Sequence, residues 1–173
     1  QGMKSVKNLV LEQVPRTNVI GIEKDVITAD FLERLSRLLP QNQFQDVSPI
    51  VLEVRMVKSE GELSILRKAG LISMEGFRKC EETLTEGITE IELQSEIERV
   101  QRQLGSGDGI AGRATSYCFG VIASGPNSFV MSGPFVSMSG MGLNNIRPFG
   151  PSRRQMKKGD LVIVDKGTSF QGY

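Results

Sequence analysis

The residues best placed to do chemistry lie between Gly159 and Tyr173, where the chain reads GDLVIVDKGTSFQGY. A hydrophobic strand, Leu161 to Val164, ends at the carboxylate of Asp165, and we expect a glycine turn and a second short strand to follow. A strand holds an acidic side chain rigidly, as metal and catalytic sites require. A hard divalent ion needs several oxygen or nitrogen ligands, so Asp165 can be only one of them. From spacing alone, a carboxylate that caps its own turn is the simpler explanation.

Histidine is absent from the chain, which excludes several mechanisms. Neither a Ser-His-Asp nor a Cys-His device can be built within it. Histidine-ligated zinc is excluded as well, and the isolated Cys80 and Cys118 cannot replace it. These two cysteines are expected to be reduced and packed in the core of a cytosolic protein. The G-x-x-x-x-G-K-[ST] phosphate loop is also missing.

Length and charge narrow the class of protein further. A chain of 173 residues can form one ordinary domain, or a small piece and a larger one. Its net charge of +1 gives no reason to expect binding to nucleic acid or to a membrane. No apolar run approaches the length of a transmembrane helix. We therefore expect a cytoplasmic protein with neither kind of partner.

The first fifty residues predict alternating helices and strands. Lys4 to Gln13 can form a short helix, and Val19 to Ile22 and Phe44 to Val47 read as strands. Between the strands, Thr28 is a plausible N-cap for a helix that ends before Pro40. Its apolar stripe consists of Phe31, Leu32, Leu35, Leu38 and Leu39. Two strands and two helices make a poor core, so this region is predicted to be part of a domain.

Two capping boxes predict the helices of the central region. Ser59 with Glu62, and Thr89 with Glu92, have the required spacing of three residues. On the first helix, the residues expected to face mostly inward are Leu63, Leu66, Ala69, Ile72, Phe77 and Cys80. The second helix carries Ile91, Ile97, Val100 and Leu104. We expect both helices to cover one face of an antiparallel sheet.

The region from Gly105 to Gly150 is rich in glycine and serine and has few charges. Tyr117 to Ala123 is its one clear strand. The segment from Phe129 to Phe149 mixes methionine and other apolar residues with glycine. Long apolar loops are uncommon unless they have a function. One hypothesis is a loop that packs on a binding cleft or a second subunit, and an equally weighted one is a mobile insertion or collapsed hairpin.

Several segments, in order along the chain, resemble the creatinase, aminopeptidase P and prolidase family, whose catalytic domain has the pita-bread fold. Ile20–Glu23 and Phe44–Ser48 look like the last part of its amino-terminal domain. Arg55-Met56-Val57-Lys58-Ser59 with Glu62 resembles the family pattern R-x-x-K-S-x-x-E. Gly87-Ile88-Thr89-Glu90 with Leu93 resembles G-x-T-E-x-x-L. Ile122–Asn127 resembles the S-G-x-N segment, and GDLVIVDKGTSFQGY is the last segment that matches.

The resemblance implies an α+β fold in two parts. Residues 3–54 would be the end of a creatinase-like amino-terminal domain, and residues 55–173 the first half of the pita-bread catalytic domain. The resemblance thus covers nearly the whole chain, which looks like a fragment of a longer protein.

The resemblance also implies an activity for the parent protein, namely metal-dependent hydrolysis of peptide bonds next to proline. Family members use two divalent ions, usually manganese, cobalt or zinc, to activate a water. Asp165 matches the first of the family's two metal-binding aspartates, while the second would lie beyond Tyr173. The chain alone is therefore expected to be inactive on a peptide substrate.

Three residues are candidates for contact with the substrate, namely Asn127, Tyr117 and Ser132. Ser132 falls where the family places a histidine, counting without gaps from Ser124. Turns also explain Asn127 and Ser132, and a core position explains Tyr117. Asp160 is expected to be structural, and the basic run from Arg153 to Lys158 to be solvated.

A binding module is the alternative to an enzyme. Some pita-bread proteins have lost their metal ligands and bind peptides or proteins, and serine at the histidine position fits this version. A metal-free hydrolase of the creatinase kind ranks lowest, since that activity depends on the missing histidine. Open sheet edges and apolar surface predict a homodimer or higher homo-oligomer in either case.

Overall fold

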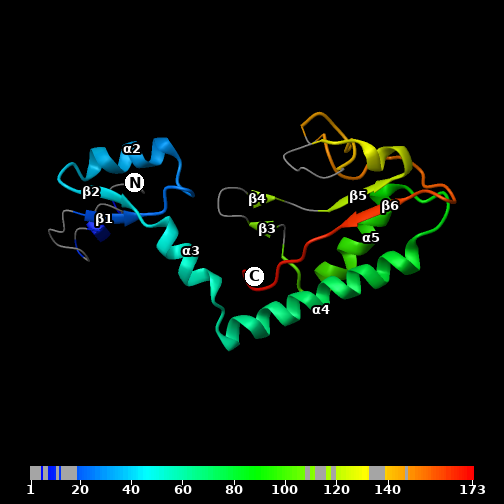
Figure 1. Cartoon of the computed structure of the whole chain (residues 1–173), viewed down its shortest axis with the longest axis horizontal. Coiled ribbons are helices and arrows are strands. Elements are labelled where there is room, and N and C mark those ends of the chain that lie inside the picture. The colour runs from blue at the N-terminus through cyan, green and yellow to red at the C-terminus, as the bar shows by residue number, and fades with distance from the viewer. Residues whose placement is uncertain are drawn as a thin grey trace. The chain divides into compact units, whose positions relative to one another are not determined.

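The computed structural model describes residues 5, 8–10, 12, 19–107, 110–111, 116–117, 120–132, 139–146 and 148–173, with the backbone alone at 110–111 and 116–117. These residues form two compact units, one that runs up to Lys58 and one that starts at Ser59 (Figure 1). The helix predicted from Lys4 to Gln13 lies partly outside the described residues. The residues of that range that the structure describes are helical. None of the described helices is long and apolar enough to cross a bilayer.

The first unit contains a pair of parallel strands, β1 (Val19–Ile22) and β2 (Gln43–Asp46). Helix α2 (Ala29–Leu38) connects them, as the order of apolar segments predicted. Parallel strands need such a crossover, because the chain must return to the same end of the sheet.

Helix α2 begins at the predicted N-cap. The hydroxyl of Thr28 accepts a hydrogen bond from the backbone N–H of Phe31 at 3.2 Å. Of the predicted stripe, Leu35 and Leu39 are buried, whereas Phe31 is exposed. The first unit therefore has a small core.

A helix that the sequence analysis did not predict follows β2. Helix α3 (Ser48–Met56) has Pro49 in its first turn, where a missing N–H costs nothing. The Asp46 carboxylate accepts from the side chain and the backbone N–H of Ser48, and these bonds lower the pKa of Asp46. The carboxylate that accepts these bonds, that of Asp46, lies two residues before Ser48 and does not have the spacing of a capping box.

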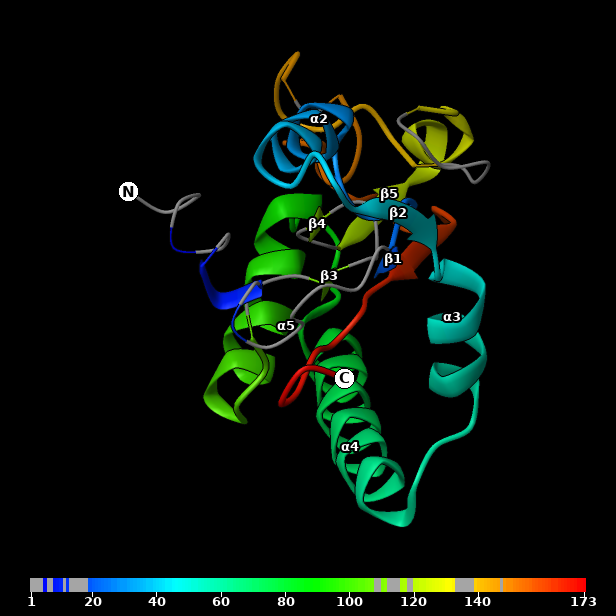
Figure 2. The same ribbon diagram turned by 90° about the vertical axis from the view of Figure 1, so that its left-hand side faces the viewer.

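Two capped helices open the second unit, α4 (Glu60–Thr83) and α5 (Glu90–Gln103). Both predicted capping boxes are confirmed, with the hydroxyl of Ser59 or Thr89 accepting at 3.3 Å from the glutamate N–H three residues later. The two helices pack against each other, as Figures 1 and 2 show from two directions.

The strands of the second unit are short and antiparallel. β3 (Ile110–Ala111) pairs with β4 (Ser116–Tyr117), and β5 (Val121–Ser124) pairs with β6 (Val162–Asp165). A 3-10 helix, η1 (Gly125–Phe129), follows β5 directly. The strand predicted from Tyr117 to Ala123 is therefore divided, and residues 118–119, which include Cys118, lie outside the described part.

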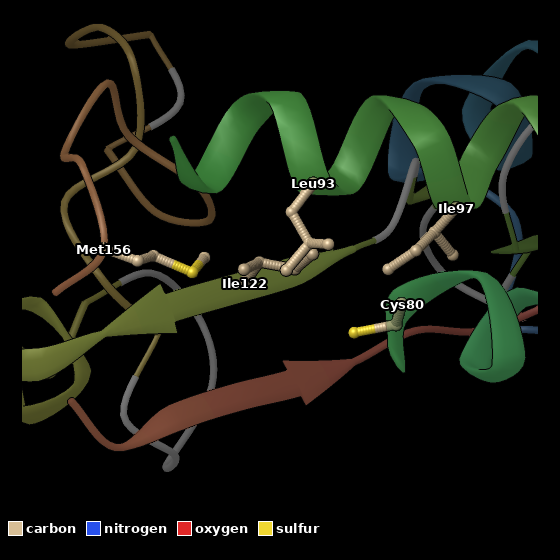
Figure 3. Close-up of a cluster of buried hydrophobic side chains, with 5 residues drawn as sticks. All are labelled: Cys80, Leu93, Ile97, Ile122 and Met156. Carbon is tan, nitrogen blue, oxygen red and sulfur yellow. The ribbon is translucent and has the colours of Figure 1, made fainter. Parts of the chain in front are cut away.

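The core of the second unit lies between the helices and this sheet. Figure 3 shows Leu93 and Ile97 of α5 directed at Ile122 of β5, with Cys80 of α4 and Met156 beside them. Val162 and Val164 of β6 pack against the same cluster. The prediction that α4 and α5 lie on one face of an antiparallel sheet thus agrees with these contacts. Burial raises the pKa of the Cys80 thiol, as expected for a packed, unreactive cysteine.

The inward face predicted for α4 is partly wrong. Ala69, Ile72 and Cys80 are buried, but Leu66 and Phe77 are 37% and 43% exposed. Only one side of this helix meets α5 and the sheet, and these two residues lie on its flank.

The second strand predicted after Asp165 does not form. Residues 166–173 contain no strand, and Phe170 and Tyr173 close a turn through backbone hydrogen bonds of 2.7 and 3.1 Å. A strand needs a hydrogen-bonded neighbour. Among the described strands, none lies alongside this segment to pair with it.

Candidate functional site

Asp165 lies at the end of β6, on the side of the sheet away from the helices. Side chains alternate along a strand, and Val162 and Val164 contact the helix-facing core. Asp165 therefore points the other way, opposite Val121 in the ladder, and it is exposed. A carboxylate on a rigid strand with its oxygens open to solvent is suited to bind a cation.

Asn127 lies in η1, where both ends of its amide are engaged. Its Nδ2 donates to Glu90 Oε2 at 2.7 Å, and its Oδ1 accepts from the backbone N–H of Met141 at 2.9 Å. The side chain is buried. Asn127 thus links η1 to the loop that contains Met141.

Glu90 is the centre of this network and is 0% exposed. Its Oε1 accepts from the backbone N–H and the hydroxyl of Ser124, both at 2.7 Å. Its Oε2 accepts from Asn127 and from the N–H and hydroxyl of Ser152, at 2.8 and 2.7 Å. All five donors are neutral, so the buried carboxylate is solvated by the protein in place of water. One side chain of α5 thereby fixes the end of β5, the 3-10 turn and a distant loop.

An ion pair extends the network towards the surface. Arg154 Nη1 donates to the Ser124 hydroxyl at 2.6 Å and lies 2.7 Å from Asp160 Oδ2. The hydrogen bond from Arg154 lowers the pKa of Asp160, with a further contribution from the Lys157 N–H. Asp160 is thus structural, as predicted. Arg154 was predicted to be solvated, but its side chain is partly buried, where it pairs with Asp160.

Gly125 is required where the network is tightest. Its φ of +49° is in the left-handed region that favours glycine. A Cβ atom there would come within 2.5 Å of Asp160 and 2.6 Å of Arg154. The glycine of the S-G-x-N segment is therefore explained by packing against the ion pair.

The other two predicted substrate residues lie apart from Asp165 in the chain and are not joined to it by any described contact. The Ser132 hydroxyl donates to the backbone oxygen of Gly140. Tyr117 lies in β4, where only the backbone is described. A direct role for these residues in binding a peptide stays a prediction.

The described residues do not form a complete metal site. Nowhere in that part of the chain do three histidine, cysteine, aspartate or glutamate side chains gather in metal-binding geometry. Asp165 is a hard oxygen donor of the type that divalent ions prefer, but a site needs several such ligands. The donor set in this chain therefore fits a metal only as one contributor.

Comparison with known proteins identifies the family. Residues 64–173 match metallopeptidase family M24, and residues 1–57 match the creatinase/prolidase N-terminal domain. The chain belongs to metallopeptidase family M24. The resemblance inferred from the sequence motifs is confirmed.

Relatives in the family are peptidases named for proline-containing substrates. A Xaa-Pro dipeptidase of Lactobacillus delbrueckii subsp. lactis is 30% identical over 155 residues, covering 88% of this chain and 36% of the relative. A Xaa-Pro aminopeptidase of Escherichia coli is 28% identical over 154 residues, covering 86% of this chain and 30% of the relative. The chain thus spans about a third of the length of these M24 relatives.

Solved structures confirm the M24 fold. The X-Pro aminopeptidase of Thermotoga maritima superimposes with a TM-score of 0.73 at 23% identity, over 97% of this chain and 40% of that one. A Xaa-Pro dipeptidase of Bacillus anthracis gives a TM-score of 0.73 at 24% identity, over 99% and 41%. The prediction of a partial pita-bread fold of the α+β class is confirmed.

The sequence analysis missed the two residues that organise this part of the M24 fold, Glu90 and Arg154. Glu90 was named only as part of the G-x-T-E segment and was given no role of its own. A signal was present, because Glu90 is the acidic residue of the G-x-T-E segment and is not itself required by the capping box. An acid that a motif specifies but a cap does not use is a candidate for a buried role.

Proposed function

We propose that this chain is the amino-terminal part of a metal-dependent Xaa-Pro peptidase that hydrolyses the peptide bond next to proline. The observation that carries the proposal is the M24 match over residues 64–173, with Asp165 open at the end of β6. We further propose that residues 3–54 belong to the amino-terminal domain and residues 55–173 to the catalytic domain.

Asp165 is the residue to which we assign a metal-binding role. When bound, a divalent ion such as manganese, cobalt or zinc supplies Lewis-acid activation of water. The contribution of this chain is one carboxylate, aimed by β6 and kept clear of the helix-facing core. With no histidine and no described cluster of ligands around Asp165, we expect no peptidase activity from the chain alone.

The proposed substrate is a peptide, and two of the three candidate residues would act on it indirectly. Asn127 and Ser132 both hold backbone in place, through Met141 and Gly140. A homo-oligomeric state and a cytoplasmic location are further parts of the proposal.

The metal-binding role can be tested in a protein that continues the chain to the length of its M24 relatives. Calorimetric titration with Mn²⁺ should give a binding isotherm that Asp165→Asn abolishes. Asp30→Asn, which removes an exposed carboxylate on α2, is the matched control and should bind as the unaltered protein does. Unchanged binding by the Asp165→Asn variant would contradict the role of Asp165.

A metal-independent peptide-binding module is the second candidate. It is favoured by Ser132 at the position where the family has a histidine, in a chain that has none. A fluorescent proline-containing peptide would then bind with the same affinity in EDTA and in the Asp165→Asn variant. Hydrolysis of the peptide in the presence of Mn²⁺ would rule this candidate out.

A further inference from the structure

Helix α5 presents a buried polar edge to the sheet as well as an apolar one. Glu90, Gln94 and Gln101 are all buried, and Glu98 is on the same side at 33% side-chain exposure. Spacings of four, four and three residues place them along one face of a helix. Their partners lie on or beside the strands, from Ser124 at one end to Thr168 at the other.

Lys166, the residue that follows Asp165, forms an ion pair with Glu98 of α5. Lys166 Nζ lies 2.6 Å from Glu98 Oε1, and the Lys166 side chain is only 6% exposed. Gln94 Nε2 donates to the same oxygen at 2.8 Å. A Cβ atom on Gly120 would approach Lys166 Cδ to 2.9 Å, so the lysine stem lies tightly against the start of β5.

A second contact holds the chain just beyond. Gln101 Nε2 donates to Thr168 Oγ1 at 3.0 Å, and the backbone N–H of Gly107 donates to Ser169 O at 2.9 Å. No described strand pairs with residues 166–169. These side-chain contacts with α5 replace the strand pairing that would otherwise fix the segment.

We propose that the Glu98–Lys166 ion pair, supported by Gln94, positions Asp165. Neighbouring side chains of a strand point to opposite faces. Lys166 directly follows β6, so fixing its side chain against α5 directs the Asp165 carboxylate to the face of the sheet away from α5. Glu98 and Lys166 are positioning residues, because they act on a ligand through Asp165. The consequence for metal binding rests on the proposed function, whereas the positioning does not.

The positioning can be measured in this chain by amide hydrogen exchange. Lys166→Met keeps the stem and removes the charge, and it should speed exchange of the amides between Val164 and Thr168 about tenfold through local opening. Lys79→Met, which removes an ion pair within α4, is the control and should leave these amides unchanged. Equal exchange in the Lys166→Met variant and the unaltered chain would overturn the proposal.

A charge reversal separates a specific pair from a general loss of packing. The double variant Glu98→Lys with Lys166→Glu keeps opposite charges across the same gap. The Gln94 amide can turn, since its Oε1 has no partner in the described structure and would accept from the new lysine. Exchange should return to within about threefold of the original rate. Exchange as fast as in Lys166→Met would contradict positioning by charge pairing.

The functional consequence is tested in the protein continued to full family length. Lys166→Met should weaken Mn²⁺ binding by about tenfold, and the charge reversal should restore it. Ile97→Val is a core change that lowers stability but leaves the ion pair intact, so it should not alter Mn²⁺ affinity. If the unaltered protein binds no Mn²⁺, the proposed function fails and the exchange experiment still decides the positioning. If it binds Mn²⁺ and Lys166→Met binds equally well, the positioning of a ligand is overturned.

Discussion

At the scale of single residues, Glu90 provides the sharpest prediction. Glu90→Gln keeps the shape but places an amide NH₂ among five hydrogen-bond donors, so at least one buried donor loses its acceptor. An unsatisfied buried group and weaker bonds to an uncharged acceptor should together lower the free energy of unfolding by about 3 kcal/mol. Urea denaturation of the variant measures this loss.

Glu92→Gln is the matched control for this prediction. Glu92 lies two residues away on the same helix and is exposed, and its pKa is lowered chiefly by the bond from the Thr89 hydroxyl. Loss of its charge should cost well under about 1.5 kcal/mol, as for other capping interactions. Similar losses in the two variants would show that the buried network is not the source of the stability.

Asp160 makes a prediction about pH. Its pKa is depressed in the folded chain, first by the hydrogen bond from Arg154. An unfolded aspartate titrates near pH 4, so the ionised pair stabilises the fold above that pH and is lost as pH falls through the lower folded value. The stability difference between the unaltered chain and Asp160→Asn should be largest at neutral pH and vanish at the acid end. Thermal unfolding from pH 7 downwards measures it, and a difference independent of pH would argue against a charge effect.

The sequence indicated Asp165 and Asn127 but could not reveal what holds them. Strand position and motif resemblance were enough to select Asp165 as a candidate ligand, because both are local along the chain. The Glu90 network joins residues that are distant in sequence, such as Ser124 and Ser152, and no local pattern encodes such a meeting. The same reason explains why Arg154 looked like part of a solvated basic run.

At the scale of elements, the contact between α4 and α5 predicts opposite effects for two glycines of one helix. A Cβ atom at Gly76 would lie 2.6 Å from Gln101 Nε2, whereas one at Gly70 would meet nothing within 4 Å. Gly70→Ala should stabilise by up to about 1 kcal/mol through helix propensity. Gly76→Ala should destabilise by about 1 to 2 kcal/mol, because Gln101 must move and lose its bond to Thr168. Chemical denaturation of both variants measures the two changes in stability. Stabilisation by Gly76→Ala would show that α4 and α5 leave room for a Cβ atom beside Gln101.

Helices with a cap signal were predictable and elements that depend on a neighbour were not. The hydroxyl residues Thr28, Ser59 and Thr89 marked three helix starts correctly, since a cap is a local interaction. Helix α3 was missed because its N-cap, Val47, makes no side-chain bond. The strand predicted after Asp165 was wrong because strand propensity does not supply a pairing partner.

At the scale of the whole molecule, the flank of α4 exposes apolar surface. Leu66 and Phe77 are eleven residues apart, close to three turns of helix, and Leu84 at the C-cap continues the same line at 42% exposure. Apolar side chains aligned in this way favour association, because burying each removes surface from water. We therefore predict that the chain self-associates as concentration rises, in accord with the expected homo-oligomer.

The flank can be tested by one charge placed on it and one placed away from it. Phe77→Glu should shift sedimentation velocity profiles towards the monomer, since a carboxylate cannot be buried without a partner. Leu71→Glu is the control, because Leu71 is 57% exposed on the same helix but lies well round from Phe77. It should leave the distribution of species unchanged. A monomeric unaltered chain at every concentration would contradict the prediction, and equal effects of the two variants would assign the association to net charge instead of this flank.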